Sequence, residues 1–538
     1  MGHARFTSQV LGAAALAHGA SAQLYNQVIQ TNYGPVQGIP AFNSSPNGNI
    51  SNWEDITVWK GIPYGADTSG ENRWTPPKNA TPWNTTLQAN KMGPICGPGM
   101  PSTTGGTVSE DCLNLNIWTN GNSTDAKLPV VFWSFPAGGA ADQPLFDGAG
   151  MASQGIVFVN YNYRISALGW LSTPELSAEM YKATGSNSSG NWGQLDQIHA
   201  LKWVHANIAA FGGDPDHITV MGQSAGSAAV YHFVNSPLSK GLIVGAIAES
   251  GTRDPYDPEA LTLAENYRNQ SYALASGLEY MASKNVSTIA EMRALPLADV
   301  EESLFGGTFS DKFGNVLDGY AIPAKYIETL ATGPANDVPY ITGNTKDESG
   351  AATSTNLTVA EYEAEIEAQY GAYNLSSTFL ELYPASNTTQ ASMAYNAHWR
   401  DTSCVSSWSF ANRWSVKSKS PIWTYYWDHA PPGQTQGAYH ESEINYVLNN
   451  LYGTDKPWEA VDFEIALKMN GYWANFAKTL NPNNGGSYIG NGTLPQWSAN
   501  SETDMVTMEV GDGFGKVPIG SADQVGAITK YFSYQNPV

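Results

Sequence analysis

The spacing of apolar and polar residues divides the chain into two parts. Up to about residue 125, short apolar stretches such as residues 59–64 and 113–118 alternate with segments rich in Pro and Gly, which predicts short strands. From Leu128 onward, continuous apolar runs alternate with stretches of helical periodicity. This second pattern is typical of β-strands and α-helices in alternation, and it predicts a parallel sheet.

Several apolar runs in the second part are predicted as strands buried on both faces of that sheet. They are residues 129–133, 156–161, 218–221, 243–248, 338–342 and 422–427. A helix is predicted over residues 194–211, where apolar side chains recur on one face and a Gly-Gly-Asp-Pro segment follows. No repeat, charge block or linker interrupts residues 23–538, so we expect one large, doubly wound α/β domain.

The run at residues 218–221 leads into Gly222-Gln223-Ser224-Ala225-Gly226, and residues 228–234 have helical character. A G-x-S-x-G pentapeptide between a strand and a helix is typical of a nucleophile elbow, although the motif also occurs by chance in ordinary turns. The serine of such an elbow lies in strained backbone, and its two glycines let strand and helix approach closely. Ser224 is therefore predicted to be a nucleophile, with the Ala225 amide beside it at the start of the helix.

A serine hydroxyl needs a base, and the base needs a third group that orients it. In α/β-hydrolases these residues follow in the order serine, acid, histidine. Glu348 and its neighbour Asp347 both come just after a predicted strand and are candidates for the acid. Of the later histidines, His398, His429 and His440, only His440 lies in a loop of small residues. Spacing leaves Asp347 and His429 open as alternatives.

The first 22 residues have the pattern of a secretory signal peptide. Arg5 supplies a positive charge, residues 10–17 form a short apolar core, and Ala20-Ser21-Ala22 is a small-residue cleavage site. The core is too short to span a bilayer, and no later segment offers eighteen consecutive apolar residues. We therefore expect a secreted protein whose mature part is residues 23–538.

Composition and sequons agree with an extracellular protein. Charged residues make up 14% of the chain, the net charge is −22, and this acidity argues against nucleic acid as a partner. N-x-S/T sequons predict N-linked glycans on the surface. They begin at Asn43, Asn49, Asn79, Asn84, Asn122, Asn187, Asn269, Asn285, Asn356, Asn374, Asn387 and Asn491.

The chain has three cysteines. Cys96 and Cys112 flank a loop rich in Gly, Pro, Ser and Thr, and in an oxidising compartment they are predicted to form one disulfide. Cys404 remains, in a segment of helical character, and is expected to be a buried, inert thiol.

Several blocks in a fixed order carry a family resemblance. They are residues 59–64, 109–116, 162–164 with 169–171, 190–197, and 207–213 ahead of the elbow. With these blocks the chain resembles the type B carboxylesterase (cholinesterase-like) family along nearly its whole mature length, and in particular secreted fungal-type carboxylesterases. The resemblance implies the α/β-hydrolase fold, with a large, mostly parallel central sheet flanked by helices and a small N-terminal β region.

The resemblance also assigns site residues. The family's acid is second in an Asp-Glu pair, which falls on Glu348, and its histidine precedes a small residue, a Glu and an apolar strand, which falls on His440. The implied catalytic triad is Ser224, His440 and Glu348. Two structural ion pairs are implied as well, Arg73 with Glu110 and Arg164 with Asp196.

The resemblance is less direct for the oxyanion hole. The family usually has three glycines after an aromatic-rich strand, and residues 135–140 here read Phe-Pro-Ala-Gly-Gly-Ala. Alignment on Trp133 selects Ala137 and Gly138, whereas alignment on the glycines selects Gly138 and Gly139. We predict a hole formed by the amides of Gly138, Gly139 and Ala225.

Together these features predict a secreted serine esterase that needs no metal or cofactor and acts on small to medium soluble esters. Its rate is expected to rise with one ionisation of His440 near or somewhat below neutral pH. The rivals are a lipase or sterol esterase, an acyl-transferring relative, and a non-catalytic adhesion protein of the same fold. Gln223, where many family members have Glu, argues against a choline ester.

Loop length separates the esterase from the lipase. Residues 97–111, inside the predicted disulfide, are few and rich in Gly and Pro, which opposes the amphipathic helix of a lid. The alternative is a lid formed by another segment, within residues 300–320.

Overall fold

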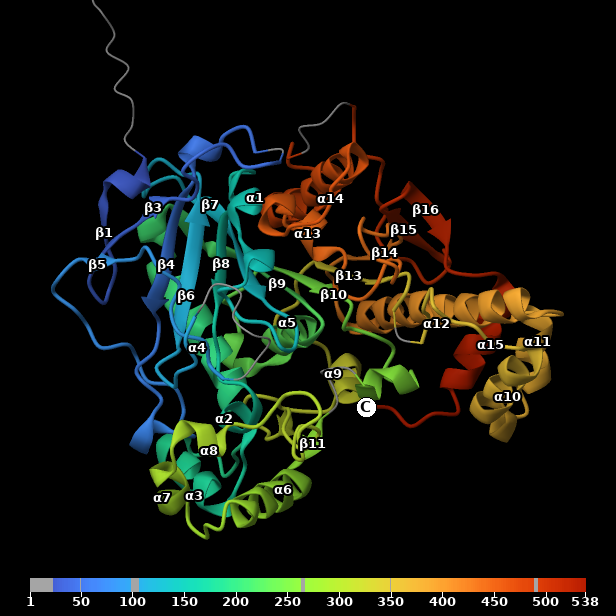
Figure 1. Cartoon of the computed structure of the whole chain (residues 1–538), viewed down its shortest axis with the longest axis horizontal. Helices are drawn as coiled ribbons and strands as arrows, with labels where there is room; N and C mark the ends of the chain where they lie inside the picture. The colour runs from blue at the N-terminus through green and yellow to red at the C-terminus, as the bar shows by residue number, and fades with distance from the viewer. Residues whose placement is uncertain (1–22, 49, 98–105, 263–266, 349, 488–491) are drawn as a thin grey trace, which may run out of the picture.

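The structure is a computed structural model that describes residues 23–48, 50–97, 106–262, 267–348, 350–487 and 492–538. The predicted signal peptide, the sequons at Asn49 and Asn491, and most of the loop between the two paired cysteines lie outside the described residues. A large sheet crosses the described part of the chain, with helices on both of its sides (Figure 1). This architecture is the predicted α/β fold.

The sheet has 11 strands in the order β16-β15-β14-β13-β10-β9-β7-β8-β6-β4-β3. From β15 to β8 in this order, each strand is parallel to its neighbours. At one edge β6, β4 and β3 each pair antiparallel with the strand before them in the order, and at the other edge β16 pairs antiparallel with β15. The strands are β3 Ile39–Pro40, β4 Thr57–Pro63, β6 Asn114–Thr119, β7 Leu128–Ser134, β8 Val157–Tyr161, β9 Gly213–Gln223, β10 Gly245–Glu249, β13 Tyr340–Thr345, β14 Ile422–Trp427, β15 Val506–Val510 and β16 Phe514–Pro518.

Two small sheets lie outside the large one. The N-terminal region contributes β1 Val28–Gln30, β2 Pro35–Gln37 and β5 Leu87–Gln88, which form the predicted small β region. Later in the chain, β11 Arg268–Asn269 pairs in parallel with β12 Val316–Leu317. This second pair brings two segments almost fifty residues apart to the same place.

Helices cover both sides of the large sheet, as Figure 1 shows. On one side α4 Trp192–Asn207 and α5 Ala225–Asn235 pack on the central strands, and α12 Thr388–Lys417 packs on β13 and β14. On the other side lie α1 Ala149–Ala152, α13 Ile444–Val447 and α14 Ala460–Thr479. The sheet is therefore doubly wound, as predicted.

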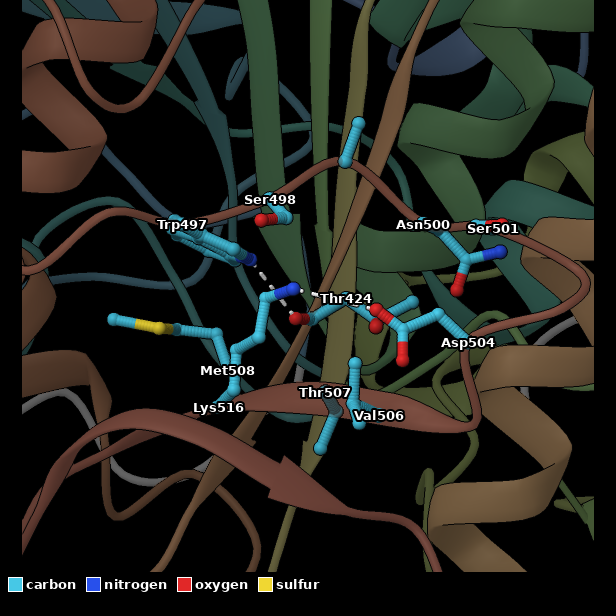
Figure 2. A pocket seen from close by; sticks show the side chains of 11 residues that line it. Thr424, Trp497, Ser498, Asn500, Ser501, Asp504, Val506, Thr507, Met508 and Lys516 are labelled. Atoms are coloured by element: carbon cyan, nitrogen blue, oxygen red, sulfur yellow. Dashed lines mark hydrogen bonds and ion pairs between the residues drawn. The ribbon is translucent and has the colours of Figure 1, made fainter.

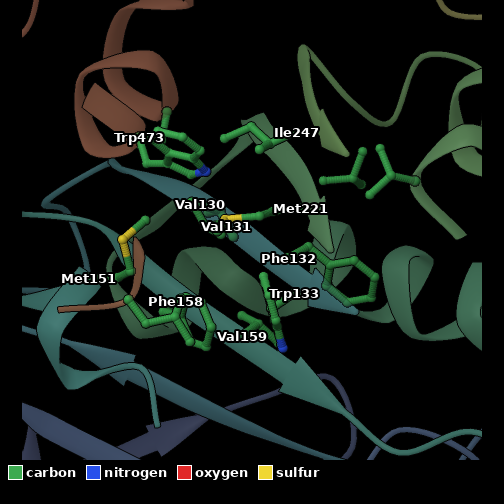
Figure 3. Packing of buried hydrophobic residues seen from close by; sticks show 14 of the residues in the cluster. Val130, Val131, Phe132, Trp133, Met151, Phe158, Val159, Met221, Ile247 and Trp473 are labelled. Atoms are coloured by element: carbon green, nitrogen blue, oxygen red, sulfur yellow. The ribbon is translucent and has the colours of Figure 1, made fainter. Parts of the chain in front are cut away.

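The core is centred on β7 (Figure 3). Residues 130–133 of this strand are fully buried although their side chains alternate between the two faces. Met151 from α1 and Trp473 from α14 join Met221 from β9 and Ile247 from β10 in the same cluster. A strand covered on both faces can bury every side chain, which explains why its sequence is continuously apolar.

A second hydrophobic cluster surrounds one end of α12. It is formed with α10 Val359–Tyr370, α11 Ser376–Leu382 and α15 Ala522–Phe532, and the rings of Tyr370 and Phe379 stack in it 3.7 Å apart. The other end of α12 belongs to the main core through Phe410 and Trp414. One helix thus joins both clusters, which supports the expectation of a single domain over residues 23–538; that boundary stays a prediction.

Three local predictions were wrong. Residues 208–211 form a 3₁₀ turn instead of the end of an α-helix, because Gly212, at φ 82°, turns the chain away. The elbow strand β9 begins at Gly213, since its first residue already pairs with Leu128. The apolar stretch after the histidine, which the resemblance implied to be a strand, lies at residues 444–447 and forms helix α13. All four are buried, and a short, fully buried apolar run has no periodicity that separates helix from strand.

The predicted cross-links are confirmed. Cys96 and Cys112 form a disulfide with their Cα atoms 5.1 Å apart. The buried ion pairs have the predicted partners, with a shortest N–O distance of 2.6 Å for Arg73–Glu110 and 2.7 Å for Arg164–Asp196. Cys404 lies on α12 as a free thiol, but it is only partly buried.

Two surface features bear on location. The ten sequon asparagines among the described residues are all exposed. Among the described helices, none combines the length and apolar character that a bilayer crossing requires.

Candidate active site

Ser224 lies at a sharp turn between β9 and α5. Its φ of 55° and ψ of −117° are strained for a residue with a side chain, and its backbone N–H donates to the carbonyl of Glu249 at 2.9 Å. A Cβ on Gly222 would come within 2.5 Å of the Gly226 carbonyl, and one on Gly226 within 2.0 Å of the Ser134 carbonyl. Both glycines are required by close backbone contacts, as the elbow motif predicts.

His440 and Glu348 are brought together by two loops after parallel strands. The Nδ1 of His440 lies 2.5 Å from Oε1 of Glu348, whose Oε2 accepts a hydrogen bond from the Thr345 amide at 2.9 Å. The other ring nitrogen, Nε2, lies 3.4 Å from the side-chain nitrogen of Gln223, the residue just before Ser224. The imidazole therefore has its acid on one side and the elbow on the other.

Asp347 has a different role from its neighbour. Its carboxylate pairs with Arg400 at 2.5 Å and accepts a hydrogen bond from the Ala438 amide at 2.9 Å. Ala438 lies two residues before His440. Asp347 thus holds the histidine loop in place, while Glu348 contacts the imidazole itself.

The other candidate histidines are engaged elsewhere. His398 is fully buried on α12 and its Nε2 is hydrogen-bonded to Tyr370; burial lowers the pKa of His398 to about 3. His429 is held between Asp512 at 2.6 Å and Asp462 at 2.9 Å, one at each ring nitrogen. These contacts give both residues structural roles.

The charges around His440 change how it ionises. Burial alone would lower its pKa, but the charge and hydrogen bond of Glu348, with the charges of Glu443 and Glu441, raise the pKa to about 9. Burial would likewise raise the pKa of Glu348, yet His440, Arg253 and the Thr345 amide leave it below its usual value. The direction of this shift is opposite to the expected ionisation near or below neutral pH, which stays a prediction that the pH–rate profile tests.

Ser224 and His440 open into one cavity of about 600 Å³. Ala137 and Ala225 also line it, and so do Trp170, Arg268, Leu304, Phe305 and Phe313. Part of the wall therefore comes from residues 304–315, within the segment that the sequence offered as an alternative lid. A neighbouring cavity of about 570 Å³ shares Ala137 and Phe305 with it and is lined by Gly138 and Gly139.

In the glycine-containing turn after β7, one amide predicted as an oxyanion donor already has a backbone partner. The amide of Gly139 donates to the Pro136 carbonyl at 2.9 Å, so this N–H is already used within the turn. Gly138 occupies the left-handed region at φ 81°, which a residue without a Cβ adopts at no steric cost. Ala137 and Ala225 line the cavity of Ser224, whereas Gly138 and Gly139 line only the neighbouring one.

Two buried acids behind the elbow were missed from the sequence. Glu249 ends β10, adjacent to the elbow strand, and its Oε1 accepts from Trp473 at 2.6 Å. Burial raises the pKa of Glu249 to about 8, and burial with the charge of Glu249 raises the pKa of Glu443. The position of Glu249 at a strand end next to the nucleophile strand was the available signal.

One further cavity lies away from Ser224. The small one at β14 and β15 in Figure 2 has a volume of about 10 Å³, room for a single water, and the Trp497 indole donates to the Thr424 carbonyl at its wall. Within the described part of the chain, no group of three or more His, Cys, Asp or Glu side chains is arranged to hold a metal ion.

Comparisons with known proteins identify the family of this chain. The family described as "Carboxylesterase family" matches residues 25–518. The chain is 30% identical over 529 residues to fumonisin B1 esterase of Sphingopyxis macrogoltabida, covering 94% of this chain and 91% of that protein. It is 29% identical to para-nitrobenzyl esterase of Bacillus subtilis, covering 85% and 91%.

Structural comparison gives the same result. A solved PNB esterase superposes with a TM-score of 0.70 at 26% identity, over 93% of this chain and 99% of that one. The family match at residues 25–518 spans the elbow and the loops of Glu348 and His440. The chain is a carboxylic ester hydrolase and belongs to the carboxylesterase family.

Proposed function

We propose that this chain hydrolyses esters through an acyl-enzyme on Ser224. The Ser224 hydroxyl attacks the ester carbonyl while Nε2 of neutral His440 takes its proton. His440 then returns the proton to the leaving alcohol, and a water activated by the same imidazole releases the acid. Glu348 keeps Nδ1 protonated and stabilises the imidazolium through its 2.5 Å contact.

The oxyanion that forms in each step needs donors that are fixed before the reaction. We assign this role to the amides of Ala137, Gly138 and Ala225. Ala137 and Ala225 line the same cavity as the nucleophile, and Ala225 begins helix α5, whose N-terminal dipole favours negative charge. Gly139 is left out because its amide is bonded to Pro136.

One observation carries the proposal: a strained serine and an imidazole that is bonded to a carboxylate line one cavity, together with Ala137 and Ala225. An adhesion protein of the same fold would have no need to keep this arrangement. The test is Ser224→Ala, with His440→Ala beside it. Because triad members act as a unit, each variant should lose activity on 4-nitrophenyl acetate by several orders of magnitude and keep the native circular dichroism.

A covalent probe distinguishes an enzyme with a reactive Ser224 from a protein that only binds esters. A fluorophosphonate should label the intact protein at one site, with the added mass on the peptide that contains Ser224. Turnover of 4-nitrophenyl acetate by Ser224→Ala at the wild-type rate, or labelling of that variant, would overturn the acyl-enzyme.

The substrates we propose are small to medium esters dissolved in water. The two cavities beside Ser224 have volumes of about 600 and 570 Å³, in the range of sites that enclose drug-sized molecules. A lipase is the second candidate, favoured by 28% identity to human bile salt-activated lipase over 85% of this chain.

We also propose that the protein is secreted and N-glycosylated. The disulfide suits an oxidising compartment, and every described sequon asparagine is exposed. After expression in a eukaryotic secretory host, the protein should be found in the culture medium. It should begin at Gln23 and lose mass on treatment with an N-glycanase. Retention inside the cell with Met1 intact would contradict this.

A further inference from the structure

Aromatic side chains line the cavity that contains Ser224. Trp170, Phe305 and Phe313 form part of its wall, next to Leu304. They come from two separate parts of the chain. Trp170 is the last residue of helix α2 Ser166–Trp170, while both phenylalanines belong to the segment just ahead of β12. A bound ester therefore has flat, apolar side chains beside the nucleophile.

The indole of Trp170 is held at three points. Its Nε1 donates to Oδ1 of Asn315 at 3.2 Å. Its ring lies at 85° to the ring of buried Tyr163, with the centroids 6.4 Å apart. Its six-membered ring lies against Gly193, where a Cβ would come within 3.1 Å of Cη2. The indole is only partly buried, and a side chain fixed in this way loses little conformational entropy when a ligand packs against it.

Phe313 is held by other aromatic rings. It makes an edge-to-face contact with Tyr280 at 87°, with the centroids 5.1 Å apart, and its centroid lies 6.5 Å from that of Phe309. Tyr280 is itself fully buried, so Phe313 rests on a fixed support. Phe305, at 64% exposure, lies at the mouth instead. Trp170 and Phe313 are thus the anchored aromatic side chains of this wall.

Anchored aromatic side chains favour a flat aromatic ligand over a saturated ring of similar size. Two aromatic rings attract each other in offset-stacked or edge-to-face arrangements, beyond the effect of the apolar area that they bury. Burial of apolar area alone acts in the other direction, because a cyclohexyl group has more apolar surface than a phenyl group. The sign of the preference therefore separates ring pairing from simple hydrophobic burial.

The cavity has room for such a group. Its volume is about 600 Å³, whereas a cavity of roughly 150 Å³ already admits benzene. The remaining space can hold the ester group next to Ser224 and His440, which line the same cavity.

We propose that the preferred esters of this enzyme carry an aromatic ring, which packs on the wall formed by Trp170 and Phe313 while Ser224 attacks the ester carbonyl. The inference rests on the proposed function, since it places the ester at Ser224. Trp170 and Phe313 then determine specificity and take no part in bond making. The ring can belong to the acyl group or to the alcohol.

The experiment compares matched esters. On the acyl side, methyl phenylacetate is compared with methyl cyclohexylacetate. On the alcohol side, benzyl acetate is compared with cyclohexylmethyl acetate. In every ester a CH₂ group separates the ring from the ester group, so the two members of a pair have nearly the same carbonyl reactivity. The readout is the ratio of kcat/KM for the aromatic ester to that for the saturated ester, measured by acid release at constant pH.

The wild-type ratio should exceed one for at least one pair. In Trp170→Leu that ratio should fall about 2- to 10-fold, the range expected for a lost aromatic pair, and Trp170→Phe should retain part of it. The control is Trp83→Leu. Trp83 is a partly buried tryptophan of the N-terminal region whose indole donates to the Pro35 carbonyl at 2.9 Å, and its loss should leave the ratio unchanged. The pair that responds identifies the side of the ester that carries the ring.

Several outcomes would overturn the proposal. They are a wild-type ratio at or below one for both pairs, an unchanged ratio in Trp170→Leu for both pairs, and an equal fall in Trp83→Leu. If Trp170→Leu lacks the native circular dichroism, Phe313→Leu takes its place with the same expected fall. Failure of the proposed function is distinguishable, since Ser224→Ala would then still hydrolyse cyclohexylmethyl acetate.

Discussion

The carboxylate of Asp347 accepts a hydrogen bond from the Ala438 amide at 2.9 Å, and this bond joins the loop of Glu348 to the loop of His440. The adjacent acid, Glu348, contacts the imidazole of His440. Glu348 thus orients the imidazole, while Asp347 holds the loop that carries it. The pair Asp347-Glu348 is therefore one unit in which only the second residue faces the reaction.

Asp347→Ala should reduce kcat without abolishing it. Loss of the loop contact displaces His440, and a small misplacement of a catalytic group can cost up to about 100-fold in rate. Steady-state kinetics with 4-nitrophenyl acetate measure this. Arg400→Ala is the control, because it removes the 2.5 Å ion pair and leaves the bond to Ala438. An equal loss in both variants would assign the effect to the ion pair.

The pH profile should have its acidic limb at higher pH than an ordinary histidine gives. His440 acts as a base only when neutral, and its pKa of about 9 means that the imidazolium persists above neutral pH. The rate should therefore rise with pH through that pKa. We expect kcat/KM for a neutral ester, measured from pH 5 to 10, to increase through one ionisation above 6.5.

Two variants test the cause of this shift. Glu348→Gln should move the limb to lower pH, because Glu348 supplies the largest interaction that raises the His440 pKa. Glu441→Gln removes a weaker charge and should move it less. A wild-type midpoint at or below 6.5 would show that the carboxylates do not stabilise the imidazolium in the working enzyme.

The elbow should not tolerate a methyl group at its second glycine. In Gly226→Ala the new Cβ would come within 2.0 Å of the Ser134 carbonyl, a backbone atom that cannot move aside. We expect a loss in the free energy of unfolding of about 3 kcal/mol, together with loss of activity. Gly526→Ala is the matched control on helix α15, where no atom lies within 4 Å of the new Cβ.

The control should gain about 1 kcal/mol, since alanine favours a helix over glycine. Urea unfolding followed by tryptophan fluorescence measures both variants. A Gly226→Ala protein with wild-type stability would mean that the strand and helix of the elbow are farther apart than the contact with Ser134 implies.

The sequence predicted the parts of this site that depend on local pattern. The elbow follows from a strand, a pentapeptide and a helix, and the resemblance separated Glu348 from Asp347. The hydrogen bond of the Gly139 amide to Pro136 could not be predicted, because it depends on the path of the turn, which residue spacing does not encode. The upward direction of the His440 pKa shift could not be predicted from spacing, because Glu348, a residue far from it in sequence, supplies the largest interaction that raises the pKa.

The residues that line the cavity could not be predicted from the sequence for a related reason. Arg268 lies in a two-residue strand, and such a short element has no periodicity to recognise. Phe305 lies in a segment where neighbouring residues form only bends and turns. Both residues line the cavity of Ser224, and the pairing of β11 with β12 joins two segments that are far apart in sequence. The composition of the cavity wall is thus the feature that required the structure.

The kinetics toward long-chain esters should show whether the segment around Phe305 covers the site as a lipase lid would. Phe305 is 64% exposed and borders both cavities, so the mouth of the site is already lined by an apolar side chain in this state. A lid that opens at an oil surface would instead bury the apolar lining until an interface is present. We therefore expect ordinary saturation kinetics for 4-nitrophenyl butyrate, with no change in slope when an emulsified ester passes its solubility limit. The measurement is the initial rate on tributyrin below and above saturation, with Phe305→Ser beside the wild type. A sharp increase at the solubility limit that disappears in Phe305→Ser would establish the lipase instead, with this segment as the part that responds to the interface.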